Sequence, residues 1–128
     1  MLRAAFIGAG RRAQSAHYPS VNRLDETSIE AVAELDEERM GTVVDGYNIP
    51  RSFGDYREML DKERLDVLSV CTGDNRHAQM VVDAAQRGVR GVACEKPLAT
   101  TMAEANRMIE ACEQNGVVLT VDHSRRLH

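Results

Sequence analysis

The sequence has few cysteines, no excess of basic charge and no long apolar run, and each of these absences excludes a class of protein. Cys71, Cys94 and Cys112 are odd in number, far apart and set in apolar stretches, and no C-x-x-C occurs. They predict buried free thiols of a reducing compartment instead of a disulfide framework. The formal net charge of −4 argues against a nucleic-acid surface, because such a surface needs a concentrated basic face.

The hydrophobic pattern also argues against membrane and export segments. Only the run at residues 2–7 precedes the first glycine, and it is too short for a signal-peptide core or a membrane span. A chain of 128 residues without repeats can bury a core as one domain. We therefore expect a single cytoplasmic domain that covers residues 1–128.

Apolar strand-like runs alternate along the chain with helical patterns. Such alternation predicts a parallel sheet with helices on both faces, in three αβα layers. We expect a doubly wound α/β fold of the Rossmann type, with strand order 3-2-1-4-5 and a ligand crevice between strands one and four. The five expected strands are Leu2–Ile7, Ser28–Ala33, Val67–Cys71, Val89–Cys94 and Val117–Val121.

The helix boundaries carry their own signals. Asp36, Asp55 and Thr101 each stand where a side chain can cap the first turn of a helix. Gly88 follows a helical pattern at the position where glycine commonly ends a helix. Pro19 is expected to break or restart the first helix midway.

The segment Ile7-Gly8-Ala9-Gly10-Arg11-Arg12-Ala13 joins the first strand to the first helix and carries a G-x-G-x-x-A pattern. Gly8 suits a tight turn, Gly10 allows backbone to approach a pyrophosphate, and Ala13 keeps the helix close to the strand. The helix N-terminus supplies N–H groups and a positive dipole end. The pattern therefore predicts a dinucleotide site, although the string alone also occurs in turns that bind nothing.

Glu34 follows the second strand, where an acid can accept hydrogen bonds from the adenosine ribose of NAD. The simpler alternative is a solvated strand end, and Asp36 is a rival that better suits a helix cap. A carboxylate at this place repels a 2′-phosphate, which favours NAD. NADP remains an alternative because Arg11 or Arg12 could approach that phosphate, although both arginines also suit plain exposed positions.

Two further segments follow predicted strands on the crevice side. Thr72 begins the first, in which His77 suits either a packed ring or a functional one. Glu95-Lys96-Pro97 ends the fourth strand, where a lysine could donate to a substrate hydroxyl while the proline fixes the turn. An ordinary Glu/Lys strand end is the alternative.

Taken together, these motifs resemble the N-terminal half of the Gfo/Idh/MocA family of sugar and polyol dehydrogenases. The likeness rests on the glycine fingerprint, the acid, T-x-x-x-x-H and E-K-P-L-A in this order, and it covers essentially all 128 residues. It implies that Lys96 lies beside the nicotinamide and positions or protonates the reacting oxygen, with Pro97 commonly cis. It also implies that His77 lies near the cofactor. Gly73, where the family usually has proline, and Glu34, where it usually has aspartate, depart from the pattern.

The resemblance implies the nucleotide-binding domain of an NAD(P)-dependent dehydrogenase that acts on a CH–OH group of a sugar, inositol or related polyol. Family members continue into a second α/β domain that holds substrate, so we expect this chain alone to bind cofactor without turnover. Apolar surface near the fifth strand then favours a homo-oligomer. A stand-alone, non-catalytic module is the alternative, whereas an S-adenosylmethionine methyltransferase would have no use for E-K-P. We predict no metal, nucleic-acid or membrane partner.

Overall fold

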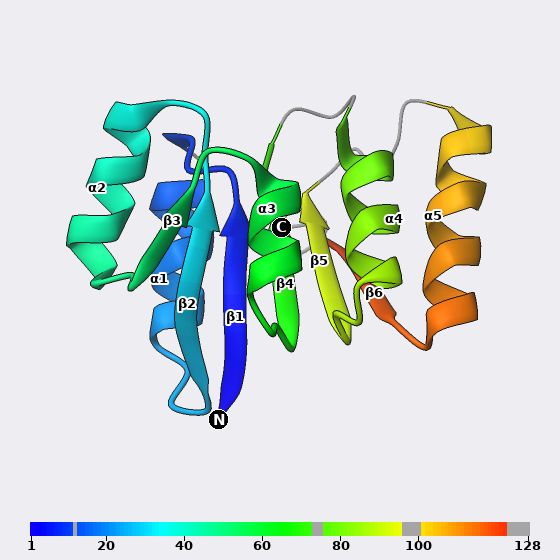
Figure 1. The fold of residues 1–128 in the computed structure, drawn as a ribbon, viewed down its shortest axis with the longest axis horizontal. Helices are drawn as coiled ribbons and strands as arrows, with labels where there is room; N and C mark the ends of the chain where they lie inside the picture. The colour runs from blue at the N-terminus through cyan, green and yellow to red at the C-terminus, as the bar shows by residue number, and fades with distance from the viewer. Residues whose placement is uncertain (12, 73–75, 96–100, 123–128) are drawn as a thin grey trace, which may run out of the picture.

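The structure, a computed structural model, describes residues 1–11, 13–72, 76–95 and 101–122. Strands and helices alternate along these residues and build a layered α/β domain (Figure 1). The strands are β1 Leu2–Ile7, β2 Thr27–Ala33, β3 Arg51–Phe53, β4 Val67–Val70, β5 Gly91–Glu95 and β6 Val118–Asp122. The helices are α1 Tyr18–Asn22, α2 Glu37–Tyr47, α3 Tyr56–Lys62, α4 His77–Gln86 and α5 Met102–Asn115, and a π-helical turn, η1 Ala13–His17, precedes α1.

The described strands form one parallel sheet in the order β3-β2-β1-β4-β5-β6. This confirms the doubly wound Rossmann class that the sequence predicts. The chain reverses direction across the sheet between β1 and β4, so the carboxyl ends of these neighbours flank the crevice where such folds bind ligands.

One strand, β3, is absent from the sequence prediction, and it changes how the others are numbered. Its three residues pair with Ala31–Ala33 of β2 at the sheet edge. With β3 counted, the strand at Val67–Val70 is the fourth, and it lies beside β1 instead of at the edge. The crevice accordingly lies between β1 and this strand. An Arg-Ser-Phe segment has no apolar run, so its strand conformation depends on pairing with β2.

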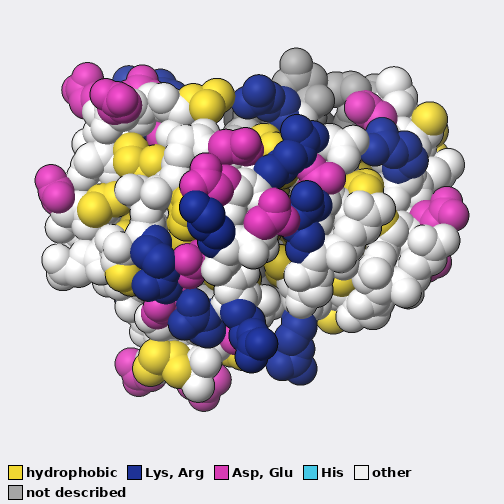
Figure 2. All heavy atoms as spheres, in the orientation of Figure 1, with side chains coloured by type: hydrophobic (Ala, Val, Ile, Leu, Met, Phe, Trp, Pro, Cys, Tyr) yellow, Lys and Arg dark blue, Asp and Glu magenta, His cyan; other side chains and the backbone are white. Residues whose placement is uncertain are grey.

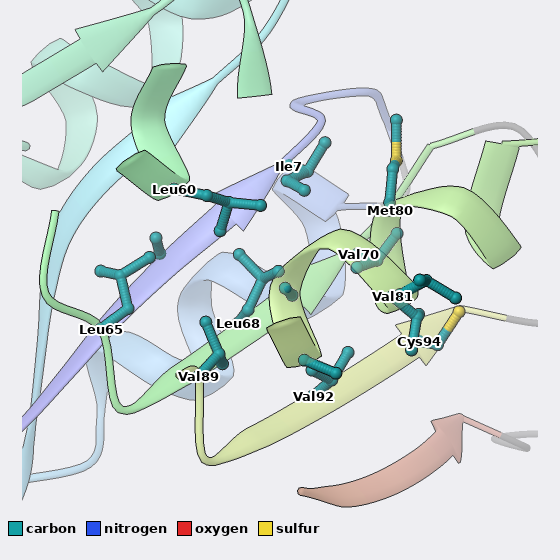
Figure 3. Packing of buried hydrophobic residues seen from close by; sticks show 14 of the residues in the cluster. Ile7, Leu60, Leu65, Leu68, Val70, Met80, Val81, Val89, Val92 and Cys94 are labelled. Atoms are coloured by element: carbon teal, nitrogen blue, oxygen red, sulfur yellow. The ribbon is translucent and has the colours of Figure 1, made fainter. Parts of the chain in front are cut away.

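Residues that alternate along β1 point to two separate cores. Ala5 and Ile7 belong to the larger one, which α3, α4 and α5 cover. Figure 3 shows this core, with Leu60 from α3 and Met80 from α4 directed toward the strands. Phe6 belongs to the smaller core on the opposite face, beneath α1 and α2. β1 and β2 therefore contribute to both cores, whereas β4 and β5 contribute buried residues to the larger core alone.

The predicted helix caps form. Asp36 accepts from the N–H of Arg39 at 3.0 Å, and Thr101 accepts from that of Glu104 at 3.1 Å. Asp55 likewise caps α3. Pro19 lies in the first turn of α1 directly after η1, so the interruption of the first helix comes just before the proline.

The three cysteines form no disulfide, as predicted, but their exposure differs. Cys94 and Cys112 are buried, whereas Cys71 is only half-buried. Burial raises the pKa of Cys94 to about 12, with the nearby charge of Glu95 adding to the shift. That thiol therefore stays protonated at neutral pH.

Four charged side chains join four neighbouring segments, namely β1, β2, β3 and the end of α3. The Glu63 side chain is 5% exposed and accepts from Arg51 Nε at 2.6 Å and from Arg3 Nη2 at 3.4 Å. Glu30 of β2 pairs with the same two arginines. On the face of the domain that Figure 2 shows, Lys and Arg side chains lie among Asp and Glu side chains.

Tyr18 is the largest fully buried side chain and connects the smaller core to the glycine turn. Its ring stacks on Phe6 with 3.8 Å between centroids and on Tyr47 with 5.5 Å. Its hydroxyl donates to the carbonyl of Gly8 at 2.9 Å. Burial, followed by the nearby Cys71 and Glu34, raises the pKa of Tyr18 far above its ordinary value, so the hydroxyl keeps its proton.

Replacing Tyr18 by phenylalanine should therefore destabilise the domain. The change keeps the stacked ring but leaves the Gly8 carbonyl without its buried donor, which costs about 1–3 kcal/mol. Urea unfolding measures the free energy. Tyr47→Phe is the matched control, because Tyr47 is only half-buried, and it should change stability by less than about 0.5 kcal/mol. Equal stability of Tyr18→Phe and wild type would contradict the role of the hydroxyl.

Candidate cofactor-binding site

A pocket of about 600 Å³ lies at the carboxyl ends of the central strands. It brings together residues from the glycine turn, the end of β2, the loop after β3 and the end of β4. Five of the predicted site residues line it, namely Gly8, Gly10, Arg11, Glu34 and Thr72. The sequence prediction therefore identified residues that are distant along the chain but meet at one place.

Gly8 makes the turn off β1 in a way that no other residue could. Its φ is +101°, a conformation that a Cβ opposes, and an added Cβ would lie 2.7 Å from the carbonyl oxygen of Cys71. Gly10 differs, since a Cβ there would meet nothing within 4 Å. The space over Gly10 is thus open, as the approach of a diphosphate to the backbone requires. Ala13 is buried beneath the turn.

Glu34 bridges the glycine turn and the start of α2. Its Oε1 accepts from the N–H of Ala9 at 2.7 Å, and its Oε2 accepts from the N–H of Asp36 at 2.8 Å. These two bonds fix the carboxylate at the pocket wall, where a ribose hydroxyl could donate to it. Asp36, the rival for that role, caps α2 and does not line the pocket.

Thr72 and His77 have different positions relative to the pocket. Thr72 lines it, whereas His77 is fully buried and outside the lining. The Nε2 atom of His77 lies 2.8 Å from the backbone oxygen of Thr72. Because a carbonyl only accepts, Nε2 carries the proton in this bond. His77 therefore fastens the segment after β4 to the start of α4, and its predicted proximity to the cofactor stays a prediction.

Glu95 ends β5 and pairs with Nε2 of His17 in η1. The pair connects the helix that follows the glycine turn to the strand that carries the E-K-P motif. Neither side chain lines the pocket. The other predicted residues of this group, Lys96 and Pro97, lie outside the described residues, as does Arg12.

Several lining residues were not predicted from the sequence. Three arginines, Arg39, Arg57 and Arg76, line the pocket in addition to Arg11, so its walls favour an anionic ligand. Leu35 is 72% exposed beside Glu34 and offers an apolar surface of the kind that a base contacts. The residues after β3 would have been predicted had β3 itself been recognised, because strand ends on this side of the sheet form the crevice. The lining residues also missed include Gly54, Asp55, Tyr56, Cys71 and Met80.

No helix in the described parts of the chain has the length and apolar character to cross a membrane. Among the same residues, no group of three or more histidine, cysteine or acidic side chains could hold a metal ion.

A parallel sheet, a glycine turn at its switch point and an acid at the end of β2 define the class of dinucleotide-binding Rossmann domains. Residues 2–123 match the model of the Gfo/Idh/MocA oxidoreductase family, NAD-binding Rossmann fold. The chain belongs to this family.

Individual relatives agree with this assignment. The chain is 35% identical to D-apiose dehydrogenase of Paraburkholderia graminis over 122 residues, which are 95% of the chain and 32% of the relative. It is 27% identical to myo-inositol 2-dehydrogenase of Thermotoga maritima, over 98% of the chain and 37% of the relative. The structure of the WlbA dehydrogenase from Bordetella pertussis, in complex with NADH and UDP-GlcNAcA, superposes with a TM-score of 0.87 at 26% identity, covering 94% of the chain and 36% of that protein. The chain thus spans about a third of the length of these relatives.

The two glycines should respond differently to substitution by alanine. Gly8→Ala places a Cβ against the Cys71 carbonyl at an unfavourable φ, so it should lower the free energy of unfolding by more than about 1 kcal/mol. Gly10→Ala should leave stability within about 0.5 kcal/mol of wild type but weaken dinucleotide binding. Urea unfolding and calorimetric titration with NAD separate these effects. Equal losses of stability in both variants would contradict the assignment.

Proposed function

We propose that this chain is the cofactor-binding domain of an NAD-dependent dehydrogenase that oxidises a CH–OH group of a sugar, inositol or related polyol. The observation that carries the proposal is the hydrogen bond between Glu34 and the glycine turn, at 2.7 Å from Ala9 N to the carboxylate. It supports the proposal because it holds a carboxylate suited to a ribose beside a turn whose remaining N–H groups suit a diphosphate. The substrate class rests on the names of the relatives, which include D-apiose and myo-inositol dehydrogenases.

The chain's own residues account for binding and orientation of the cofactor. The open backbone at Gly10 receives the diphosphate, and the surrounding arginines balance its charge. Glu34 accepts from the adenosine ribose, with Leu35 beside it for the base. NAD, when bound, supplies the hydride acceptor. We propose that substrate must also be held in near-attack geometry by residues beyond this stretch, so that the chain by itself binds cofactor without turnover.

NADP is the competing cofactor. A second hollow of about 480 Å³ lies against Arg11, Gln14, Ser15 and Arg39, and the two arginines also line the main pocket. A 2′-phosphate there would meet two guanidinium groups but also the charge of Glu34. Because both oxygens of Glu34 are fixed by backbone donors, the carboxylate cannot turn away from that phosphate. The balance favours NAD.

Calorimetric titration of the chain with NAD and, separately, with NADP tests the proposal. Glu34→Gln should weaken NAD binding about tenfold, because an amide has one acceptor oxygen where the carboxylate has two. NADP binding should weaken less, since repulsion of the 2′-phosphate is lost too.

Glu37→Gln is the matched control. It makes the same change of charge in the exposed first turn of α2, outside the pocket lining, and should leave both affinities unchanged. Saturation by neither dinucleotide would overturn the proposal.

We extend the proposal to Lys96 through the motif that follows Glu95. Lys96 would donate to the reacting oxygen of the substrate, and Pro97 would fix the turn. In a form of the protein long enough to oxidise a polyol, Lys96→Ala should lower kcat by about 100-fold or more, because the hydrogen bond that orients the reacting oxygen and stabilises it while its proton leaves is lost. NAD affinity should not change, and titration measures it separately. Unchanged kcat would overturn this role.

A further inference from the structure

Asp83 is a buried carboxylate of α4. The residue is only 6% exposed, and most of the residues around it in this helix are buried alanine, valine and methionine, although Gln79 and Arg87 lie one turn before and after it. A charge buried in such surroundings costs several kcal/mol unless partners satisfy it. Hydrogen bonds to the carboxylate must therefore offset the free-energy cost of burying its charge.

The partners of Asp83 come mainly from the start of α3. Its Oδ2 accepts from the hydroxyl of Tyr56 at 2.5 Å and from Nε of Arg57 at 3.1 Å, and its Oδ1 accepts from Nε2 of Gln79 at 2.8 Å. Burial pushes the pKa of Asp83 upward, but the bonds from Tyr56, Gln79 and Arg57 outweigh burial and lower that pKa. The carboxylate is therefore ionised at neutral pH.

Two of these partners belong to the wall of the cofactor pocket. Tyr56 and Arg57 both line it, whereas Asp83 does not. Asp83 holds the guanidinium through Nε, and the Arg57 side chain is 53% exposed. The same guanidinium lies 5.3 Å from the centre of the Tyr56 ring. Asp83, which does not line the pocket, thus holds in place a tyrosine and an arginine that do.

The place of this wall in the sheet identifies the part of the ligand that it meets. α3 follows β3, and β3 pairs with β2, which ends at Glu34. The N–H of Glu34 also donates to the carbonyl of Phe53 at 3.0 Å. The wall is therefore on the ribose-acid side of the pocket, at the opposite side of the crevice from β5.

We propose that Asp83 is a positioning residue for the cofactor, which acts through Arg57 and Tyr56 on the adenosine half of the dinucleotide. The inference rests on the proposed function. A purely structural role would be to tie α3 to α4. Arg87 of the same network makes such a tie, because it bonds Asp61 of α3 at 2.7 Å and the Asp83 carbonyl at 3.2 Å, with its Nη1 at 3.8 Å from Asp83 Oδ1, yet it does not line the pocket.

The test is calorimetric titration of the chain with NAD and with AMP, which carries the adenosine half alone. Asp83→Asn keeps the side-chain shape but removes the charge that holds Arg57, so both ligands should bind about 3- to 10-fold more weakly. Arg57→Gln should give a similar loss. Because both changes release the same guanidinium, the double variant should lose no more than the larger single loss. Asp61→Asn is the control: it makes the same change of charge and removes the bond from Arg87 that ties α3 to α4, without a contact to Asp83, and it should bind both ligands as wild type does.

The outcomes separate this inference from the proposed function. NAD binding by wild type together with unchanged affinity in Asp83→Asn would overturn the inference alone, as would losses that multiply in the double variant. Failure of wild type to bind any dinucleotide would overturn the proposed function as well. Tyr56→Phe removes one bond to Asp83 on a half-buried ring. It should weaken AMP binding too, which provides a readout should Asp83→Asn not fold.

Discussion

The close contact at Gly8 is the constraint on which the rest of the site depends. Its N–H donates to the carbonyl of Ala33 at the end of β2 at 2.8 Å, and its carbonyl accepts from Tyr18 of α1. Its missing Cβ leaves room for the carbonyl of Cys71 at the end of β4. Three strands and one helix are therefore packed around a single residue. A side chain there would move the turn away from both neighbouring strand ends, and the pocket would lose its shape.

Two carboxylates hold the residues of the pocket wall in place by different means. Glu34 stands at the surface of the pocket and is held by backbone N–H groups, so its position follows from the turn and from the start of α2. Asp83 is buried and is held by side chains, so its position depends on the packing of α3 against α4. A fixed wall reduces the loss of side-chain freedom on binding, because the groups that meet the ligand are already ordered.

Features that depend on residues close together in the chain could be predicted from the sequence, whereas features that depend on distant contacts could not. The glycine turn, the Glu34 position and the caps at Asp36 and Thr101 depend on residues near one another in the chain, and each was predicted. β3 was missed because its strand form comes from pairing with β2, not from its own Arg-Ser-Phe sequence. The Asp83 network was missed for the same reason, since 26 residues separate it from Arg57.

His77 shows a second limit of prediction from the sequence. The sequence left open whether its ring is packed or functional, and the structure shows a buried ring whose Nε2 contacts the backbone oxygen of Thr72. A pattern of residue types cannot distinguish a ring that faces a ligand from one that holds the loop beside it. Only the burial of the ring decides between them, and burial depends on how α4 packs against the sheet.

The pocket and the end of β5 lie over different parts of the sheet. The described pocket lies over β1, β2 and β4 and the loop after β3, with arginines and Glu34 suited to the adenosine and diphosphate parts of a dinucleotide. β5 is on the other side of β4, and the His17–Glu95 pair joins its end to the helix that follows the glycine turn. β5, which ends at Glu95, therefore lies on the far side of β4 from Glu34, and this is the side that a dinucleotide bound at Glu34 and extended across the turn would approach.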